Sequence, residues 1–443
     1  MKLFKQLYIE NRFFYVFLGV ICIFILGYPF PFVLKLAKVV LFLFLLTVVA
    51  EVLWLFNKNI QFKIERKTPR LLSLGDSNTL ELIVQNLASV SLKTRIIEEL
   101  PIQLQERDFE VDRDFEPSEE ITLPYTIKPN SRGLYLFGDT ILYLSSKLGL
   151  VSRQYRGKNP MEMEVYPSII QMKKYELAHL NKLHQFLGIK KIRRIGHSYD
   201  FEQIKDYVQG DDYRSLNWKA TGRYNRLMVN QYQDQNAQPV YCVIDKSRYM
   251  KMPFSGMSLL DYSINASLVI SNTALKKKDK TGLITFSDKL ETVIKADNKP
   301  YQLKSILEAL YNEKERMPEA NYELLYTFLQ KSIRQRSLMF LFSNIETKSS
   351  LSRILPLLKG ISKNHLVVMI FFENNELTEF ATKKPDELKD IYLSVTSQKF
   401  ISEKEVIIHT LRQNGVHTIF TRPENLTMNT LNKYLELKAR GLI

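Results

Sequence analysis

The sequence predicts a membrane α-hairpin, a β-sandwich and a C-terminal α/β domain with a mostly parallel sheet. Two long apolar stretches lie near the N-terminus, and short alternating strands separated by turn residues follow them. From Pro239 onward, buried apolar runs alternate with helix-length amphipathic stretches. We therefore expect a transmembrane hairpin at 1–58, a β-sandwich-like domain at 59–166, a connecting segment at 167–238 and an α/β domain at 239–443.

The apolar stretches are the clearest membrane signal. Phe13 to Leu34 carries no charge, and Val39 to Phe56 carries only Glu51. Each is close to the roughly 20 residues that cross the hydrocarbon of a bilayer. We therefore expect two spans joined by a tight turn that holds Gly27, Pro29, Pro31, Lys35 and Lys38.

Basic residues flank the two spans and predict their orientation. They outnumber the lysines of the turn, which places both ends of the hairpin and the soluble domains in the cytoplasm. These flanking residues are Lys2, Lys5, Arg12, Lys58, Lys63, Arg66 and Lys67. The net charge of +15 over 443 residues fits this bias. No nucleic-acid-binding module is visible, so we expect no nucleic-acid partner.

Two cysteines, Cys22 and Cys242, make no disulfide framework and favour a reducing compartment.

Residues 62–165 read as an antiparallel β domain. Apolar and polar side chains alternate around Gly75-Asp76, and Pro and Gly separate the short runs. Such spacing is typical of a small sandwich. The sequence does not indicate its ligand.

The α/β domain is predicted from five apolar runs and one alternating edge strand. The runs are PVYCVID, TGLITFS, SLMFLFS, HLVVMIFF and VHTIFTR, with LETVIKA as an antiparallel edge. Helices are expected over 259–277, 302–311, 322–335, 349–362, 403–413 and 426–439. Ligands of such sheets bind beyond the carboxyl ends of the strands, which directs attention to Asp245 at the end of PVYCVID.

One segment carries a specific resemblance. DYVQGDDYRSLNWKATGRYNRLMVNQY, Asp206 to Tyr232, is followed closely by YCVIDKS. Together these elements resemble the bacterial domain-of-unknown-function 58 family. The resemblance implies a Rossmann-like von Willebrand A-type C-terminal domain in a multi-pass protein of the bacterial inner membrane. It also implies two kinds of partner, a MoxR-type AAA+ ATPase and other von Willebrand A-like membrane proteins.

The resemblance also implies where a divalent cation would bind. Related domains hold it with an Asp-x-Ser-x-Ser run and a later aspartate, matched here by Asp245 and Ser247. Tyr249 stands at the second serine and Asn344 at the later aspartate. A phenol and an amide are poorer magnesium ligands than a hydroxyl and a carboxylate. We therefore expect no cofactor, with Mg²⁺ or Mn²⁺ at a degenerate site as the alternative.

The Gly-Asp-Asp segment has a structural and a partner-binding interpretation. Asp211 or Asp212 can cap the following turn and Arg214 can pair with a carboxylate, while Leu216 and Trp218 pack inward. This makes the segment a brace between domains, with direct partner contact as the alternative. The residues concerned are Gly210, Asp211, Asp212, Arg214, Asn217, Trp218, Lys219, Thr221 and Arg223.

The sequence contains none of the common catalytic motifs. Walker, Gly-x-Gly-x-x-Gly, His-Glu-x-x-His and Gly-x-Ser-x-Gly patterns do not occur. We expect a membrane-anchored, non-enzymatic adaptor without catalytic residues that serves the assembly or maturation of client proteins, and whose rim at Asp245 binds partners. The alternative is a membrane- or cell-wall-associated hydrolase that uses Asp211, Asp212 or Asp245.

Overall fold

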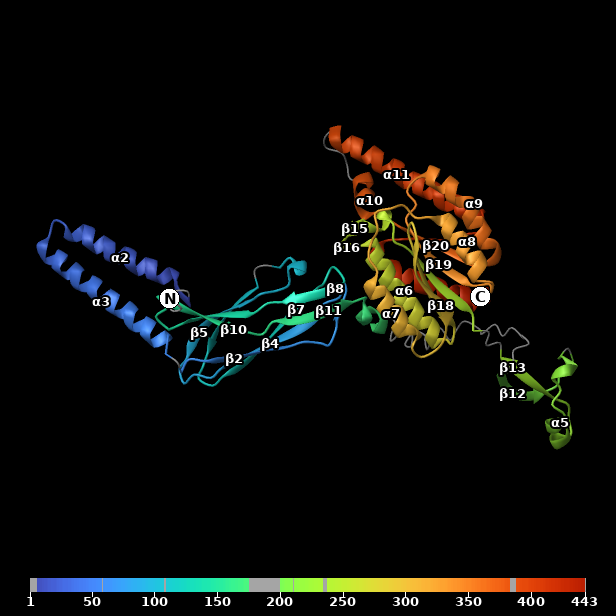
Figure 1. The fold of residues 1–443 in the computed structure, drawn as a ribbon, viewed down its shortest axis with the longest axis horizontal. Coiled ribbons are helices and arrows are strands. Elements are labelled where there is room, and N and C mark those ends of the chain that lie inside the picture. Colours follow the sequence, from blue (N-terminus) through green and yellow to red (C-terminus); the bar gives the residue numbers. More distant parts are fainter. Residues whose placement is uncertain are drawn as a thin grey trace. The chain divides into compact units, whose positions relative to one another are not determined.

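The structure is a computed structural model that describes residues 6–57, 59–106, 109–174, 200–209, 211–233, 237–382 and 388–442. The chain forms two compact units, Met1–Tyr166 and Pro167–Ile443. Figure 1 shows the elements of each unit.

Two apolar helices, α2 (Asn11–Gly27) and α3 (Pro31–Leu55), lie side by side in the first unit (Figure 1). Phe44 of α3 packs against Phe13 of α2, with ring centroids 5.2 Å apart. Pro31 occupies the first turn of α3, where a missing N–H costs no hydrogen bond. The helix therefore begins at Pro31, and the expectation that Lys35 and Lys38 lie in the turn is wrong.

Among the described helices, α3 alone is both long and apolar enough to cross a membrane. Its 25 residues extend about 38 Å, against roughly 30 Å of hydrocarbon. Helix α2 has 17 residues, which makes it a shorter apolar helix. One candidate span is therefore present, and the second span stays a proposal.

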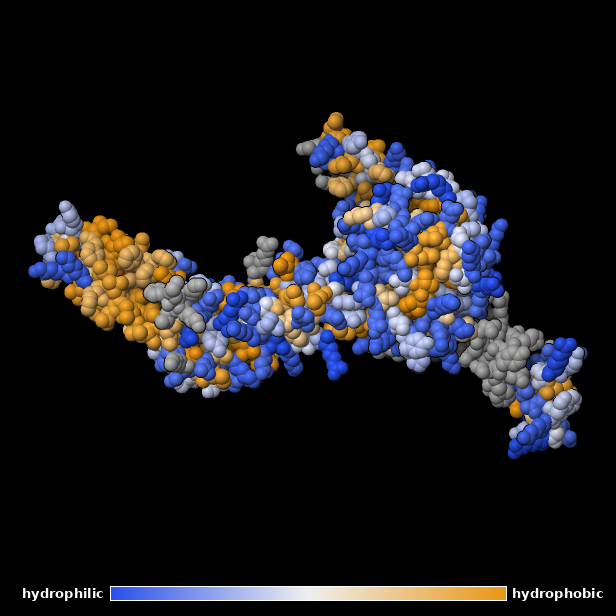
Figure 2. Space-filling view, viewed as in Figure 1, coloured by the Kyte–Doolittle hydropathy of each residue, from blue (hydrophilic) through white to orange (hydrophobic). Residues whose placement is uncertain are grey.

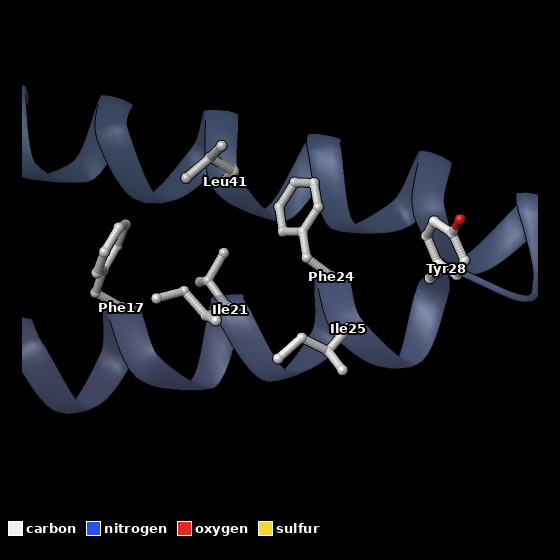
Figure 3. A pocket seen from close by; sticks show the side chains of 7 residues that line it. Phe17, Ile21, Phe24, Ile25, Tyr28 and Leu41 are labelled. Atoms are coloured by element: carbon white, nitrogen blue, oxygen red, sulfur yellow. The ribbon is translucent and has the colours of Figure 1, made fainter.

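The outer surface of α2 and α3 is apolar over most of its length (Figure 2). A groove of about 520 Å³ runs between the two helices and is lined almost entirely by aromatic and aliphatic side chains. Figure 3 shows Phe17 and Phe24 of α2 and Leu41 of α3 along this groove, with Tyr28, just after α2, at one end of it. Such a surface fits lipid better than water.

The last turns of α3 are fixed to the β domain that follows. The Ser146 hydroxyl donates to the buried Glu51 carboxylate. The Arg153 guanidinium donates to the Leu55 carbonyl over 2.9 Å and lies 5.2 Å from the Phe56 ring. Glu51, the one acid of the apolar stretch, therefore has a hydrogen-bond donor from the β domain at one of its two carboxylate oxygens.

The β domain consists of three sheets that are antiparallel except for one short parallel pair. Their buried faces carry alternate residues, such as Leu80, Leu82 and Val84 of β4 (Asn78–Asn86). The first sheet has the strand order β1 (Leu7–Ile9), β10 (Val151–Gly157), β9 (Thr140–Ser145), β5 (Leu92–Glu98) and β6 (Glu110–Phe115). The second has the order β3 (Leu72–Ser73), β11 (Met161–Tyr166) and β8 (Gly133–Phe137). The third has the order β2 (Phe62–Lys67), β4 (Asn78–Asn86) and β7 (Glu120–Ile127).

One basic residue expected to flank the membrane is instead buried in this domain. Arg66 pairs with Glu98, and its guanidinium also donates to the carbonyl oxygens of Asn159 and Gly138 at 3.0 and 3.1 Å. The pair is almost fully enclosed. The charge of Arg66 therefore has a structural role, and the orientation of the spans stays a prediction.

The mixed, mostly parallel sheet predicted for the α/β domain is present (Figure 1). Five strands are parallel, and β18 is the antiparallel edge. The order is β18 (Leu290–Asp297), β17 (Lys280–Phe286), β14 (Pro239–Asp245), β19 (Leu338–Phe342), β20 (Leu366–Phe372) and β21 (His417–Thr421). The chain runs from β14 to β17 on one side and later returns to β19 on the other. The strand order therefore reverses between β14 and β19.

Helices cover both faces of this sheet. Cys242 and Ile244 of β14 face a core shared with α6 (Leu259–Lys276), α7 (Gln302–Asn312) and α12 (Leu426–Ala439). Tyr241 and Val243 face a second core shared with α8 (Tyr322–Ser332), α9 (Lys348–Asn364) and α11 (Leu388–Gln413). Burial on both faces explains why β14 is apolar throughout up to Asp245.

Two helices differ from expectation. Helix α11 begins at Leu388, well before the predicted residue 403, and α10 (Asn375–Thr382) was not predicted. The buried residues of α11 lie mostly near its C-terminal end. Its N-terminal half exposes Ile391, Tyr392 and Val395, so it lacks the one-sided burial on which sequence prediction depends.

Small elements complete the second unit. A short hairpin joins β15 (Pro253–Phe254) and β16 (Met257–Ser258) ahead of α6. Strands β12 (Asp200–Asp206) and β13 (Met228–Gln233) form a separate two-stranded sheet, whose connection carries the 3-10 helix η2 (Tyr213–Ser215) and α5 (Trp218–Tyr224). We call β12 to β13 the motif module.

Candidate functional site

The motif module is an antiparallel hairpin with a long, structured connection (Figure 1). Asn217 caps α5 by accepting from the Ala220 N–H over 2.9 Å, and its amide donates to Asn230 over 2.8 Å. The Thr221 hydroxyl accepts from the Met228 N–H over 3.0 Å. Asn217 and Thr221 therefore hold α5 against β13, a structural role.

The two aspartates of the motif are engaged locally. The Asp211 carboxylate accepts from the Lys205 ammonium at 2.8 Å and from the Val208 N–H at 3.0 Å. The Lys205 hydrogen bond lowers the pKa of Asp211. Asp212 caps η2 by accepting from the Arg214 N–H at 3.0 Å. Gly210 lies outside the described residues.

The expectation that Trp218 packs inward is wrong. Its side chain is 71% exposed, and Tyr213 and Tyr224 are 68% and 55% exposed. Leu216 is partly buried and bridges to Val229. The connection between β12 and β13 therefore presents its large aromatic side chains to solvent.

Basic residues lie among these aromatic side chains. The Arg214 guanidinium lies 5.7 Å from the Tyr213 ring, and that of Arg223 lies 5.9 Å from the Tyr224 ring. Among the side chains that the structure describes, neither these arginines nor Lys219 forms an ion pair with a carboxylate. We define the aromatic–basic surface as Tyr213, Arg214, Trp218, Lys219, Arg223 and Tyr224.

Asp245 at the end of β14 does not lie on an accessible rim, so that expectation is wrong. Its side chain is 1% exposed. The carboxylate accepts from the Ser247 N–H at 2.8 Å and from the Ser343 hydroxyl at 2.6 Å. Ser343 also hydrogen-bonds to the Tyr322 hydroxyl, and burial raises the pKa of Asp245. The residue therefore links β14 to β19 and cannot contact a partner directly.

The two cations beside Asp245 are neutralised. Lys246 is buried between Glu291 and Glu313. Arg248 is exposed and pairs with Glu319 at 2.5 Å. Tyr249, at a departing metal position, donates its hydroxyl to Glu319 at 3.3 Å.

The residues of this edge do not fit a divalent cation. Both oxygens of Asp245 already accept hydrogen bonds, and the Asn344 amide oxygen accepts from the Lys404 ammonium of α11. A cation there would face an ammonium group across that oxygen. The Ser247 side chain is fully buried beside Asp245. Within the described ranges, no cluster of three His, Cys, Asp or Glu side chains could hold a metal.

Lys404 was missed by sequence reasoning. It is one of 62 basic residues and has no motif around it. Its contact with Asn344 joins α11 to the end of β19, positions 60 residues apart in the chain. Local sequence offers no signal for such a pairing.

Comparisons with known proteins give one matching family model and solved structures of low similarity. No curated protein matches the chain. Among solved structures, Escherichia coli alpha-2-macroglobulin from domain MG7 to the C-terminus is 17% identical, with a TM-score of 0.21 over 24% of this chain and 17% of that chain. The CARDB domain of PF1109 from Pyrococcus furiosus is 15% identical, with a TM-score of 0.18 over 24% of this chain and 93% of that domain. The PapD-like domain of human CEP192 is 11% identical, with a TM-score of 0.20 over 25% and 90%.

The family model described as "Protein of unknown function DUF58" matches residues 203–383. The matched range begins in the motif module and continues through most of the α/β domain. Over these residues, the predicted resemblance to the domain-of-unknown-function 58 family is therefore confirmed.

Proposed function

We propose that this protein is a membrane-anchored, non-enzymatic adaptor that binds a protein partner through the aromatic–basic surface of its motif module. The supporting observation is the exposure of Trp218, Tyr213 and Tyr224 beside cations that form no ion pair with a carboxylate among the described residues. Tryptophan, tyrosine and arginine are the residues that most often dominate binding energy at protein interfaces. An acidic partner surface would complement the three cations.

The partner and its setting follow from the family resemblance. A MoxR-type AAA+ ATPase is the proposed partner in the assembly or maturation of client proteins, together with other von Willebrand A-like membrane proteins. In this proposal the protein spans the bacterial inner membrane twice, through α2 and α3, and its soluble domains lie in the cytoplasm. Its mostly parallel sheet is proposed to be of the von Willebrand A type.

The hydrolase alternative has less support from the carboxylates. A general acid at neutral pH requires a raised pKa, whereas the pKa of Asp211 is lowered by Lys205. Asp212 is committed to capping η2. Asp245 has a raised pKa, but its side chain is buried and is therefore not accessible to a substrate.

The proposal is tested by co-purification from detergent. The full chain is used to capture a MoxR-type ATPase in the presence of a non-hydrolysable ATP analogue. Replacing Trp218 with alanine should reduce the captured ATPase at least about tenfold, as expected for a hot-spot residue. Tyr301→Ala is the matched control, because Tyr301 is also an exposed aromatic residue, 55% exposed, but lies outside the module.

Hydrogen exchange of β12 and β13 amides shows whether the variant module keeps its fold. Equal capture by the Trp218→Ala and Tyr301→Ala variants would overturn the assigned surface. Repeated failure of the unaltered chain to capture the ATPase would overturn the proposed partner.

A further inference from the structure

The amino-terminal edge of the parallel sheet is built from the connections that lead into its strands. These connections run from α6 to β17, from α8 to β19, from α9 to β20 and from α11 to β21. With the residues that adjoin them, they are 276–280, 331–337, 363–365 and 412–416. Because the strands they enter are parallel, all four connections meet at one edge, opposite the edge that carries Asp245.

Basic residues are concentrated at this edge. They occur in all four connections and at the end of α12, where the Lys438 ammonium donates to the Lys277 carbonyl oxygen over 3.5 Å. We define the basic edge as Lys276, Lys277, Lys278, Lys280, Lys331, Arg334, Arg336, Lys363, Arg412, Lys438 and Arg440.

Few carboxylates balance the basic edge. Asp279 is the one acid in the sequence of the four connections, and it is 2% exposed and paired with Lys438. Glu436 of α12 pairs with Arg440 at 2.7 Å. Each of these acids is therefore already used by one member of the set, and the whole set carries an excess of positive charge.

Some of this excess lies fully in solvent. Arg334 and Arg336, which precede β19, and Lys363, which precedes β20, are exposed. Among the described side chains, these three form no ion pair. The connection that leaves β18 at the same edge adds no net charge, because Asp297 pairs there with Lys299 at 3.0 Å.

Helix dipoles account for only part of this charge. The C-terminal ends of α6, α8, α9, α11 and α12 lie at the basic edge. Each such end carries roughly half a negative elementary charge, so that the five together carry roughly 2.5. This is far less than the charge of the basic residues, and Arg334 and Arg336 lie beyond the last residue of α8. The remaining charge is therefore available to an anion outside the chain.

The composition of the four connections indicates the kind of anion. Within these described connections, no large aromatic or aliphatic side chain is exposed. Binding energy at protein interfaces and in single-stranded nucleic-acid complexes depends largely on such side chains. Clustered lysine and arginine without them are typical of attraction to anionic lipid headgroups. Helix α3, apolar and long enough to cross a membrane, would keep the basic edge close to such headgroups.

We propose that the basic edge binds the anionic phospholipid headgroups of the membrane in which the chain is anchored. Phosphate oxygens of several lipids accept hydrogen bonds from its ammonium and guanidinium groups. This inference rests on the membrane anchor of the proposed function, but it involves neither the aromatic–basic surface nor an ATPase.

The inference is tested with the full chain in lipid nanodiscs. One preparation contains phosphatidylcholine, and the other contains an equimolar mixture of phosphatidylcholine and phosphatidylglycerol. A succinimidyl ester acylates accessible lysines, and mass spectrometry measures the labelling rate of each. Labelling of Lys276, Lys331 and Lys363 should fall at least about threefold in the mixed nanodiscs. Sodium chloride at about 1 M, which shortens the screening length to about 3 Å, should restore it.

Lys289 is the matched control residue, because it is exposed in the turn between β17 and β18, at the opposite edge of the sheet. Its labelling should not depend on the lipid. Replacing Arg334 and Arg336 together with glutamine should reduce the protection of Lys363 at least about twofold. Replacing Lys289 and Lys399 together with glutamine removes the same charge elsewhere and should leave that protection unchanged.

Equal labelling of Lys363 in both kinds of nanodisc, or equal protection of Lys289, would overturn the inference. Protection by a short DNA duplex in phosphatidylcholine nanodiscs, without protection by phosphatidylglycerol, would assign the basic edge to nucleic acid instead. Failure of the chain to enter nanodiscs of either composition would overturn the anchor on which the inference rests. Capture of the ATPase is measured separately, so each proposal can fail alone.

Discussion

Replacing Lys404 with methionine should stabilise the α/β domain at pH 7. The pKa of this lysine falls from 10.5 to about 8 because burial disfavours its charge, and a shift of that size corresponds to about 3 kcal/mol at neutral pH. Methionine keeps a similar apolar stem but leaves the Asn344 oxygen without its donor, which costs about 1 kcal/mol. The expected net gain is about 2 kcal/mol.

The gain should shrink as the pH rises. Because the folded-state pKa of Lys404 lies below its unfolded value, the unfolded chain binds more protons between about pH 8 and pH 10.5, and the unaltered protein gains stability across that window. At pH 9 the difference between the Lys404→Met variant and the unaltered protein should therefore be about 1 kcal/mol smaller than at pH 7.

Native-state hydrogen exchange is the appropriate assay, because it reports the opening free energy of β19 and β20 within the full chain. Lys399→Met is the matched control, an equal change at an exposed position of α11, and should alter that free energy by less than about 0.5 kcal/mol. A Lys404→Met variant that is less stable at pH 7, or a difference that does not change with pH, would refute the reasoning.

Three further substitutions test the structural assignments. Lys246→Met should destabilise the α/β domain by about 3–5 kcal/mol, measured by exchange in β14, because it leaves Glu313 charged and buried. Arg66→Met should cost a similar amount through Glu98, with increased exchange in β5 rather than in β14. Asn217→Ala should remove the cap of α5 and cost about 1 kcal/mol, seen as faster exchange of amides in α5 with β14 unchanged.

The sheet of the α/β domain was predictable because burial on both faces leaves a simple signal. A parallel strand covered by helices needs apolar residues at every position, as β14 shows from Pro239 to Ile244. The edge strand β18 alternates instead, since one face is solvated. Positions at strand ends were also predictable: Asp245 is the last residue of β14, and Asn344 lies just beyond the neighbouring strand β19.

Burial of individual side chains at that edge was not predictable. Asp245 ends a strand and carries a charge, features that suggest exposure, but Ser343 and the Ser247 N–H satisfy it inside the fold. Its carboxylate is thus enclosed by groups from two segments far apart in sequence. The exposure of Trp218 was not predictable either. A side chain of its size is usually largely buried, but Trp218 lies on the seven-residue helix α5, whose buried residue is Ala220.

Trp218 and Lys404 both lie in environments that are unusual for their residue types. One is a large aromatic side chain left in water, and the other is a cation whose pKa burial lowers to about 8. Sequences generally agree with their folds at every level, and departures concentrate where function requires them. A partner that covers Trp218 would remove the first departure. Because the two residues lie on different elements, Trp218→Ala should leave the opening free energy of β19 and β20 unchanged, and Lys404→Met should leave the module's fold unchanged.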